Sequence, residues 1–236
     1  MKFADIHNHT LAAVDDGAKS EQMMYRMLDA AYADGTRILC LTPHFHPGFF
    51  GDNRNASEDS FQKLQSYAAQ HCPHMQLYLG NELRYSPNCD HWLREGLCRT
   101  LNGTAFILVD FAADALSLQI RRGLEQLLSM GYVPVLAHAE RYSRLSVAAI
   151  RDFHRNGIRI QINAGSLTGS FGWRARLRAK RLLSEHLVCT VASDGHNLKE
   201  RPPLLSESYL VAKKLTDPRY ADRIFFHNAK NLLENN

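Results

Sequence analysis

Residues 3–9 read Phe-Ala-Asp-Ile-His-Asn-His, a short apolar run that leads into two histidines spaced two apart. The same order, an apolar run and then a polar cluster, recurs four more times. The later clusters are Thr42-Pro43-His44, Asn81-Glu82, Ala137-His138-Ala139-Glu140-Arg141 and Ser193-Asp194-Gly195-His196. Imidazoles and carboxylates are ligands that divalent metals take. We therefore expect a site for several metal ions at one end of a barrel.

Strand-like and helix-like segments alternate along the whole chain. The apolar, β-branched runs are Phe3–Ile6, Ile38–Thr42, Met75–Leu79, Phe106–Val109, Val133–Ala137, Ile158–Ile162 and Leu187–Ala192. Helical periodicity lies between them, with caps expected at Ser20, Ser57 and Ser117. This alternation predicts an α/β fold with a parallel sheet, and seven strands favour a closed or nearly closed barrel. With 236 residues, 45% of them hydrophobic, the chain is expected to form a single domain over residues 1–236.

Composition narrows the class of protein. The net charge is +4 and the charges are mixed along the chain, so no nucleic-acid partner is expected. The five cysteines never have Cys-x-x-Cys spacing, which argues against disulfide frameworks and zinc knuckles and favours a cytoplasmic protein. No apolar run approaches eighteen residues, so no transmembrane helix is expected. The charged start of the chain does not resemble a signal peptide.

Two pairs of polar residues have the spacing that suits metal binding. In parallel α/β folds the functional site lies at the carboxyl ends of the strands. His7 and His9 are two apart, so both imidazoles project to one face of a strand and one ion can take both nitrogens. Asp194 and His196 repeat this spacing after the last strand. His138, at another strand end, is a further candidate.

Carboxylates complete the candidate ligand set. Glu82 and Asp110 follow predicted strands, and Asp15 and Asp16 come soon after the first histidine cluster. A carboxylate can bridge two ions, as closely spaced metal sites require. Nitrogen and oxygen ligands without thiolate favour manganese, iron, cobalt or zinc. Two alternatives stay open: the polar residues cap and turn the chain, or one metal is held and the carboxylates support its ligands.

Two arginines indicate the substrate. Arg141 stands three residues after His138, and Arg201 stands five after His196. A guanidinium group presents a fork of donors that engages two phosphate oxygens at once. The alternative is that each arginine is a surface residue without lasting contacts. Metals and arginines beside one strand-end site indicate hydrolysis of a phosphoester.

Six short segments also carry a resemblance to a known family. They are Asp5–His9, Val14–Gly17, Gly80–Glu82, Ala137–Tyr142, Ala192–Leu198 and Arg201–Pro203. Their order and spacing resemble the PHP (polymerase and histidinol phosphatase) superfamily. More narrowly, they are similar to the bacterial manganese-dependent protein-tyrosine phosphatases of the CpsB/YwqE type. The His-x-His start alone suits many amidohydrolase-like enzymes, whereas the segments around His138 and Asp194 are far more specific.

The resemblance implies a distorted seven-stranded (β/α) barrel of the PHP type that holds up to three metal ions, most of all manganese. Carried over by motif, the three ion sites are His7, His9, Glu82 and Asp194; Glu82, Asp110 and His138; and Asp16, His44 and His196. Arg141 and Arg201 match the phosphate-binding arginines of the family. The family usually has glutamate at the position of Asp110. The shorter side chain implies a shifted strand or looser binding of the second metal.

The resemblance also implies a reaction and a partner. A metal-bound hydroxide would attack the phosphorus of phosphotyrosine while the two arginines hold the phosphoryl oxygens. The implied substrate is the C-terminal tail of a bacterial tyrosine kinase that regulates capsule or exopolysaccharide synthesis. Cysteine-dependent phosphatase chemistry is excluded, because no cysteine is followed by five residues and then arginine.

Other functions and roles stay open. The chain can be a small-molecule phosphatase such as a histidinol phosphatase, a nucleic-acid phosphoesterase, or a catalytically silent phosphotyrosine-binding domain, which Asp110 alone supports. Residues 45–54 predict a loop at the site rim, where His46 would assist the leaving group; the alternative is a loop with buried phenylalanines. Trp173–Arg181 predicts a basic helix that docks an acidic tail or simply faces solvent.

Overall fold

Parallel strands form the centre of the fold in the computed structural model, which describes residues 1–234. Among these residues the strands are β1 (Phe3–Asp5), β2 (Thr36–Leu41), β3 (His44–Phe45), β4 (Gln76–Leu79), β5 (Glu82–Arg84), β6 (Phe106–Asp110), β7 (Val133–Leu136), β8 (Arg159–Asn163) and β9 (Thr190–Ala192). One sheet has the order β1-β2-β4 and the other has the order β3-β5-β6-β7-β8-β9. Every pairing of neighbouring strands is parallel.

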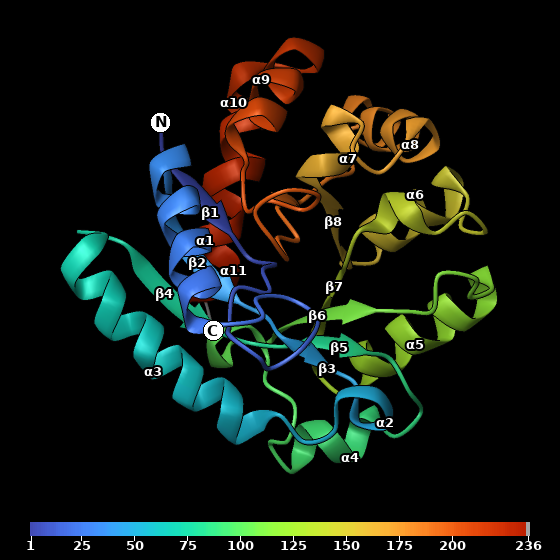
Figure 1. Cartoon of the computed structure of the whole chain (residues 1–236). Helices are drawn as coiled ribbons and strands as arrows, with labels where there is room; N and C mark the ends of the chain where they lie inside the picture. The colour runs from blue at the N-terminus through green and yellow to red at the C-terminus, as the bar shows by residue number, and fades with distance from the viewer. Residues whose placement is uncertain (235–236) are drawn as a thin grey trace.

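The two sheets join into one barrel. β3 continues β2, and β5 continues β4, after a gap of two residues in each case, so the strand segments amount to seven strands. On the other side, backbone hydrogen bonds join the residues after β1 to those after β9: His9 N donates to Gly195 O and Asp194 N to His7 O, both at 2.9 Å. Figure 1 shows the strands at the centre, with helices around them. The predicted distorted seven-stranded (β/α) barrel is therefore confirmed.

Helices lie between most successive strands, and four more follow β9 within residues 1–234. They are α1 (Glu21–Asp34), α2 (Pro47–Phe50), α3 (Arg54–His71), α4 (Cys89–Arg94), η1 (Leu101–Gly103), α5 (Ser117–Ser129), η2 (Ala139–Arg141), α6 (Val147–Arg155), α7 (Ala164–Thr168), α8 (Trp173–Ser184), α9 (Ser206–Leu215), α10 (Pro218–Asp222), η3 (Arg223–His227) and α11 (Asn228–Glu234). The expected cap at Ser20 is confirmed, since its side chain accepts from Met23 N. The cap expected at Ser57 is wrong: α3 begins earlier, and the Ser57 hydroxyl donates to Asn53 O at 2.7 Å. Ser117 is the first helical residue of α5, and Leu116 precedes it as the cap.

Apolar side chains fill the inside of the barrel and close one end of it. Ala4, Ile38 and Val135, from three different strands, belong to one buried cluster with Leu232 and Leu233 of α11. The same helix accepts hydrogen bonds from the segment before β6. The C-terminal helix thus covers the amino ends of the strands, and the carboxyl ends are left for the polar clusters.

Two other features agree with the sequence. All five cysteines are free thiols, as their spacing predicts. Among residues 1–234, none of the helices has both the length and the apolar composition that crossing a membrane requires.

Candidate metal centre and active site

The nine predicted metal ligands gather at the carboxyl ends of the strands. They are His7 and His9 after β1, Asp16 in the loop that follows, His44 in β3, Glu82 in β5, Asp110 at the end of β6, His138 after β7, and Asp194 and His196 after β9. All of them except Asp16 and His44 are buried. A buried cluster of histidines and carboxylates is typical of a metal site, because buried charges need partners.

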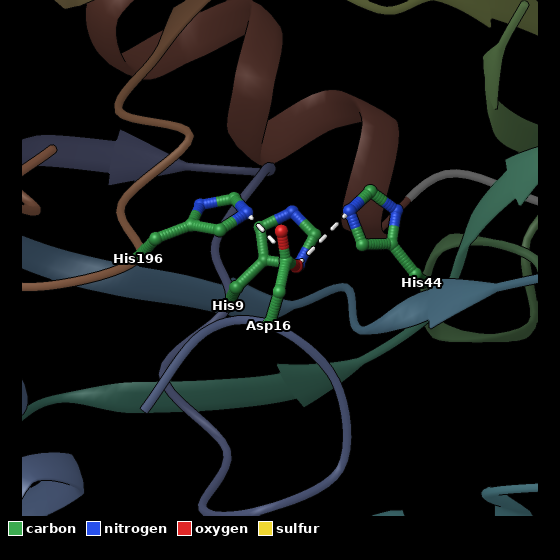
Figure 2. Close-up of side chains that lie close together, drawn as sticks. All are labelled: His9, Asp16, His44 and His196. Atoms are coloured by element: carbon green, nitrogen blue, oxygen red, sulfur yellow. Dashed lines mark ion pairs between the residues drawn. The ribbon is translucent and has the colours of Figure 1, made fainter. Parts of the chain in front are cut away.

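Four of these side chains form the group drawn in Figure 2. Asp16 Oδ1 lies 3.4 Å from His44 Nε2 and 3.4 Å from His196 Nε2, so the carboxylate sits between two imidazoles. His9 contributes the fourth donor, and all four donor atoms lie within 4.8 Å of one another. The motif-based set Asp16, His44 and His196 is therefore brought together, with His9 beside it.

A second group forms around the first histidine pair. His7 Nε2 and His9 Nε2 are 3.2 Å apart. Asp194 Oδ1 lies 3.4 Å from the first nitrogen and 3.6 Å from the second. Glu82 Oε2 approaches the same two nitrogens at 3.3 and 3.4 Å. Two imidazole nitrogens that face each other with carboxylates on both sides are arranged as they would be around one cation.

Glu82 lies at the centre of the whole cluster. Its Oε2 atom is 2.8 Å from His44 Nδ1, and its Oε1 atom is 3.0 Å from His138 Nε2. Asp110 forms a third group with His44 and Glu82, although Asp110 Oδ1 is 4.0 Å from His138 Nε2. Because the two oxygens of Glu82 reach different imidazoles, this carboxylate is placed to bridge two ions.

The donor set fits metal ions. Glu82 Oε2 and His196 Nε2 are buried and have no partner with hydrogen-bond geometry among residues 1–234. A buried polar atom without a partner is costly, and cations bound in the groups of donors to which these atoms belong would satisfy them. The donors are nitrogen and carboxylate oxygen without thiolate, which suits manganese, iron, cobalt or zinc.

The charges in the cluster shift its protonation. Burial lowers the pKa of His7, but the charges of Glu82 and Asp194 outweigh burial and raise that pKa to about 9. For His44, burial is likewise outweighed, chiefly by the charge of Glu82, and the pKa rises to about 11. Burial lowers the pKa of His196 to about 4, which leaves its ring neutral. Since a metal ion competes with protons for such nitrogens, binding of ions must release protons.

Hydrogen bonds from other residues fix the orientation of the candidate ligands. Asp15 Oδ2 lies 2.7 Å from His9 Nδ1, and Gln161 Oε1 lies 3.1 Å from His7 Nδ1. Asn163 donates to Asp194 Oδ2 at 2.6 Å. Contacts of this kind hold an imidazole or carboxylate with its other side toward the metal. Sequence reasoning missed the role of Gln161, although a glutamine within the apolar strand β8 was a visible signal.

Arg84 is a second site residue that sequence reasoning missed. Its Nη2 atom lies 3.1 Å from Asp110 Oδ2, and the hydroxyl of Tyr142 donates to Asp110 Oδ1 at 3.1 Å. Both oxygens of this carboxylate thus have protein partners. Burial, and then the charge of Glu82, raise the pKa of Asp110. The carboxylate of Asp110 is therefore directed toward Arg84 and Tyr142 as well as toward the cluster.

A cavity of about 210 Å³ opens over the cluster, and Arg84, Arg141 and Arg201 line it. Arg201 Nη2 lies 2.6 Å from Asp194 Oδ2, and Arg141 Nη1 lies 3.5 Å from the same oxygen. Both side chains are partly exposed toward the cavity. Guanidinium groups and candidate metal ligands therefore face one space, which is the arrangement that phosphoryl chemistry requires.

The segment predicted to be a loop at the site rim contains regular secondary structure. Residues 45–54 include the end of β3, the short helix α2 and the first residue of α3, so the prediction of one long loop is wrong. His46 does not line the cavity, and its ring stacks on Phe49 at 5.9 Å. Phe49 is 74% exposed, whereas Phe50 stacks on His44 at 5.3 Å. Of the three phenylalanines in residues 45–54, Phe45 is buried, Phe50 is partly buried and Phe49 is exposed, so the alternative with buried phenylalanines does not hold for all three.

The predicted basic helix is confirmed as α8, but part of its charge is engaged within the fold. Arg178 donates to Leu145 O at 2.6 Å. Arg181 pairs with Glu185 at 3.0 Å. Two of the basic side chains of this helix, Arg178 and Arg181, therefore contact their own chain.

Comparison with known proteins agrees with this site. Residues 3–234 match the family described as "Capsular polysaccharide synthesis, CpsB/CapC". Tyrosine-protein phosphatase CpsB of Streptococcus agalactiae serotype III is 32% identical over 238 residues, which cover 98% of each chain. Tyrosine-protein phosphatase YwqE of Bacillus subtilis is 31% identical over 212 residues, 89% of this chain and 84% of its own.

Solved structures give the same result. A structure of YwqE from Bacillus subtilis and CpsB from Streptococcus pneumoniae, described as unique metal-dependent tyrosine phosphatases, matches with a TM-score of 0.88 at 29% identity. It covers all of this chain and 95% of its own. A dihydropyrimidinase from Brevibacillus agri, 12% identical with a TM-score of 0.59, shares the fold alone. Fold and site define a barrel-type metallohydrolase. The chain belongs to the CpsB/CapC family, the metal-dependent tyrosine-protein phosphatases of capsular polysaccharide synthesis.

Proposed function

We propose that this chain hydrolyses phosphotyrosine in a protein substrate, in the cavity above Glu82. The observation that carries the proposal is the contact of Arg141 and Arg201 with one oxygen of Asp194. The other oxygen of Asp194 faces the nitrogens of His7 and His9. The carboxylate of Asp194 thus joins the two arginines to the candidate metal ligands. The curated relatives named as tyrosine-protein phosphatases support phosphotyrosine as the substrate.

The ions would be held by the three groups of donors around Glu82. We propose manganese as the physiological metal, with iron, cobalt or zinc as alternatives that the same nitrogen and oxygen donors accept. When bound, the ions supply a nucleophilic water near neutral pH and neutralise charge on the attacking and leaving oxygens. We propose nine ligands, and their positions around Glu82 support this set. They are His7, His9, Asp16, His44, Glu82, Asp110, His138, Asp194 and His196.

Arg141 and Arg201 would bind the phosphoryl oxygens. Asp194 holds both guanidinium groups at the cavity wall, which fixes their orientation before substrate arrives. As charge develops on the phosphoryl oxygens, donors already in place stabilise it without reorganisation. Tyr142 also stabilises this side of the cavity. Its hydroxyl donates a hydrogen bond to Asp110 and accepts one from Phe111 N at 3.0 Å.

The finer identity of the substrate is a further part of the proposal. We propose that the substrate is the C-terminal tail of a bacterial tyrosine kinase that regulates capsule or exopolysaccharide synthesis. We further propose that residues 1–236 form one domain and that the reaction takes place in the cytoplasm. The family description as capsular polysaccharide synthesis supports this context. Histidinol phosphate is the alternative substrate, and the silent phosphotyrosine-binding domain is the alternative function.

The experiment is phosphate release by manganese-loaded protein from a phosphotyrosine peptide and from histidinol phosphate. The peptide is expected to be the better substrate, and His138→Ala is expected to abolish its turnover. His154→Ala is the matched control, because this histidine lies on α6, outside the site. Preference for histidinol phosphate would refute the substrate, and binding of the peptide without any turnover would favour the silent domain.

His46 stays a candidate proton donor to the leaving group. A proton donor matters most when the leaving group is a strong base. His46→Ala should therefore slow the hydrolysis of phosphotyrosine more than that of p-nitrophenyl phosphate, whose phenolate leaves unaided. Equal losses on both substrates would exclude this role for His46.

A further inference from the structure

The ring of Phe171 lies against both arginines of the cavity. The guanidinium carbon of Arg141 is 5.3 Å from the ring centroid, and that of Arg201 is 5.8 Å from it. The two arginines come from different strand ends, one after β7 and the other after β9. One aromatic side chain therefore connects two cationic groups that the sequence places sixty residues apart.

The backbone holds this ring in place. Phe171 belongs to the tight turn between α7 and α8, in which Ser170 N donates to Gly165 O at 2.8 Å. Gly169 has φ of 105°, a conformation that favours glycine. Gly165 has no side chain where the ring lies: a Cβ there would come within 2.7 Å of Phe171 Cε2. The absence of that side chain lets the ring pack on α7.

The helix under the ring is itself tied to the site. The buried carboxylate of Glu140 accepts from the Ser166 hydroxyl at 2.5 Å and from Asn163 N at 3.1 Å. Glu140 immediately precedes Arg141, so α7 and the backbone of that arginine are linked. The side chain of Asn163 donates to Asp194, the carboxylate that both guanidinium groups contact. The ring, α7 and the arginines thus form one connected unit.

A ring in this position has a clear physical effect. Two like-charged guanidinium groups close to one carboxylate repel each other, and the negative face of an aromatic ring attracts both. The ring also restricts the rotamers of two long side chains before a phosphoryl group arrives, which favours binding. Phe171 does not line the cavity over the metal ligands; it lines a neighbouring cavity of about 230 Å³.

We propose that Phe171 is a positioning residue that holds Arg141 and Arg201 in the orientation that binds a phosphoryl group. The inference rests on the proposed function of the cavity, because it concerns the arginines of that site. Phe171 acts through the guanidinium groups, since it does not line the cavity over the candidate metal ligands.

The test uses inorganic phosphate as the probe and the full manganese-loaded chain. Its affinity is measured by calorimetry and as inhibition of p-nitrophenyl phosphate turnover, with metal content measured in every sample. Phe171→Leu removes the aromatic face at similar volume and should weaken phosphate binding about tenfold with unchanged metal content. Phe171→Tyr should restore affinity to within about twofold, since it keeps the ring. Gly165→Ala keeps the ring but displaces it, and should weaken binding as well.

Two controls separate positioning from general damage. Trp173→Leu removes the next aromatic residue, which is 67% exposed and lies under the guanidinium group of Arg174; it should leave phosphate affinity unchanged. Phe171→Leu should also have no further effect in a protein that already carries Arg141→Ala and Arg201→Ala. An additional loss in that background would overturn the inference.

The outcomes distinguish this inference from the proposed function. Turnover of phosphate esters by the wild type together with unchanged phosphate affinity in Phe171→Leu would overturn the positioning role alone. Absent turnover, with phosphate bound by the wild type and weakened in Phe171→Leu, would refute the proposed function and support the positioning role. A wild-type protein that loads manganese but binds no phosphate would overturn both.

Discussion

Gly17→Ala is the sharpest test of how the candidate metal site is built. The chain turns back at Gly17 so that Ala18 N donates to His9 O at 3.1 Å. A Cβ at Gly17 would overlap the His9 carbonyl oxygen and lie 2.7 Å from His9 Cβ. Because backbone cannot yield as a side chain does, the segment that carries His9 must shift. Overpacking of this kind costs about 2 kcal/mol, which corresponds to a fall in Tm of about 6 °C for a chain of this size.

His9 belongs to two of the three groups of donors, so its displacement should also weaken metal binding. The assay is thermal unfolding followed by circular dichroism, in manganese and in chelator, together with manganese content per chain. Both the Tm and the metal content should fall. Gly48→Ala is the matched control, since a Cβ at Gly48 meets nothing within 4 Å. A Tm within 1 °C of the wild type and full metal content in Gly17→Ala would refute the reasoning.

Three further predictions concern single carboxylates. Glu82→Gln should remove at least one ion per chain, measured by elemental analysis, and lower kcat by about 100-fold or more, because its oxygens reach four imidazoles; full metal content would contradict it. Asp110→Glu should tighten the weakest manganese site about tenfold in a titration, because the longer side chain extends toward His138; weaker binding would contradict it. A hydrogen bond from Tyr220 N lowers the pKa of Asp217, the cap of α10. The stabilisation by this cap is therefore present above about pH 4, the usual pKa of an unfolded aspartate, and is lost as the pH falls through the lowered pKa, so Asp217→Ala should lower the Tm at pH 7 and lower it less as the pH falls below that range.

The sequence predicts the architecture because the predicted strands stand out as mostly apolar, β-branched runs. β3 and β5 begin at the polar residues His44 and Glu82, outside those runs, so no apolar pattern marks them; they continue β2 and β4 after short interruptions. Their positions follow only from the register, in which His44 pairs with Glu82. This pairing brings an imidazole and a carboxylate from separate segments together, and it is set by tertiary structure.

The candidate ligands are predictable for a different reason. Residues two apart share a face of a strand, which predicts the proximity of His7 and His9 from spacing alone. Long-range partners have no such rule. Gln161 and Asn163 alternate with isoleucine in β8, so their inward direction is visible, but their contacts with His7 and Asp194 depend on how the barrel closes. Helix caps are predicted from local sequence alone, and such a prediction can fail. Ser57 is expected to cap a helix start, but it lies inside α3, where its buried hydroxyl donates to Asn53 O.

Asp110 shows most clearly what the sequence lacks. The shorter carboxylate implied a shifted strand or a loosely bound ion, yet β5 and β6 pair in regular parallel register, with Arg84 opposite Asp110. Because paired residues on neighbouring strands lie side by side, the two side chains meet, and the arginine takes one carboxylate oxygen while Tyr142 takes the other. Any ion at this position must compete with a guanidinium group for Asp110. Looser binding at this site would then result from the partner across the strand pair as much as from the missing methylene. Arg84→Leu should therefore tighten manganese binding even with Asp110 unchanged, and unaltered affinity would assign the whole effect to side-chain length.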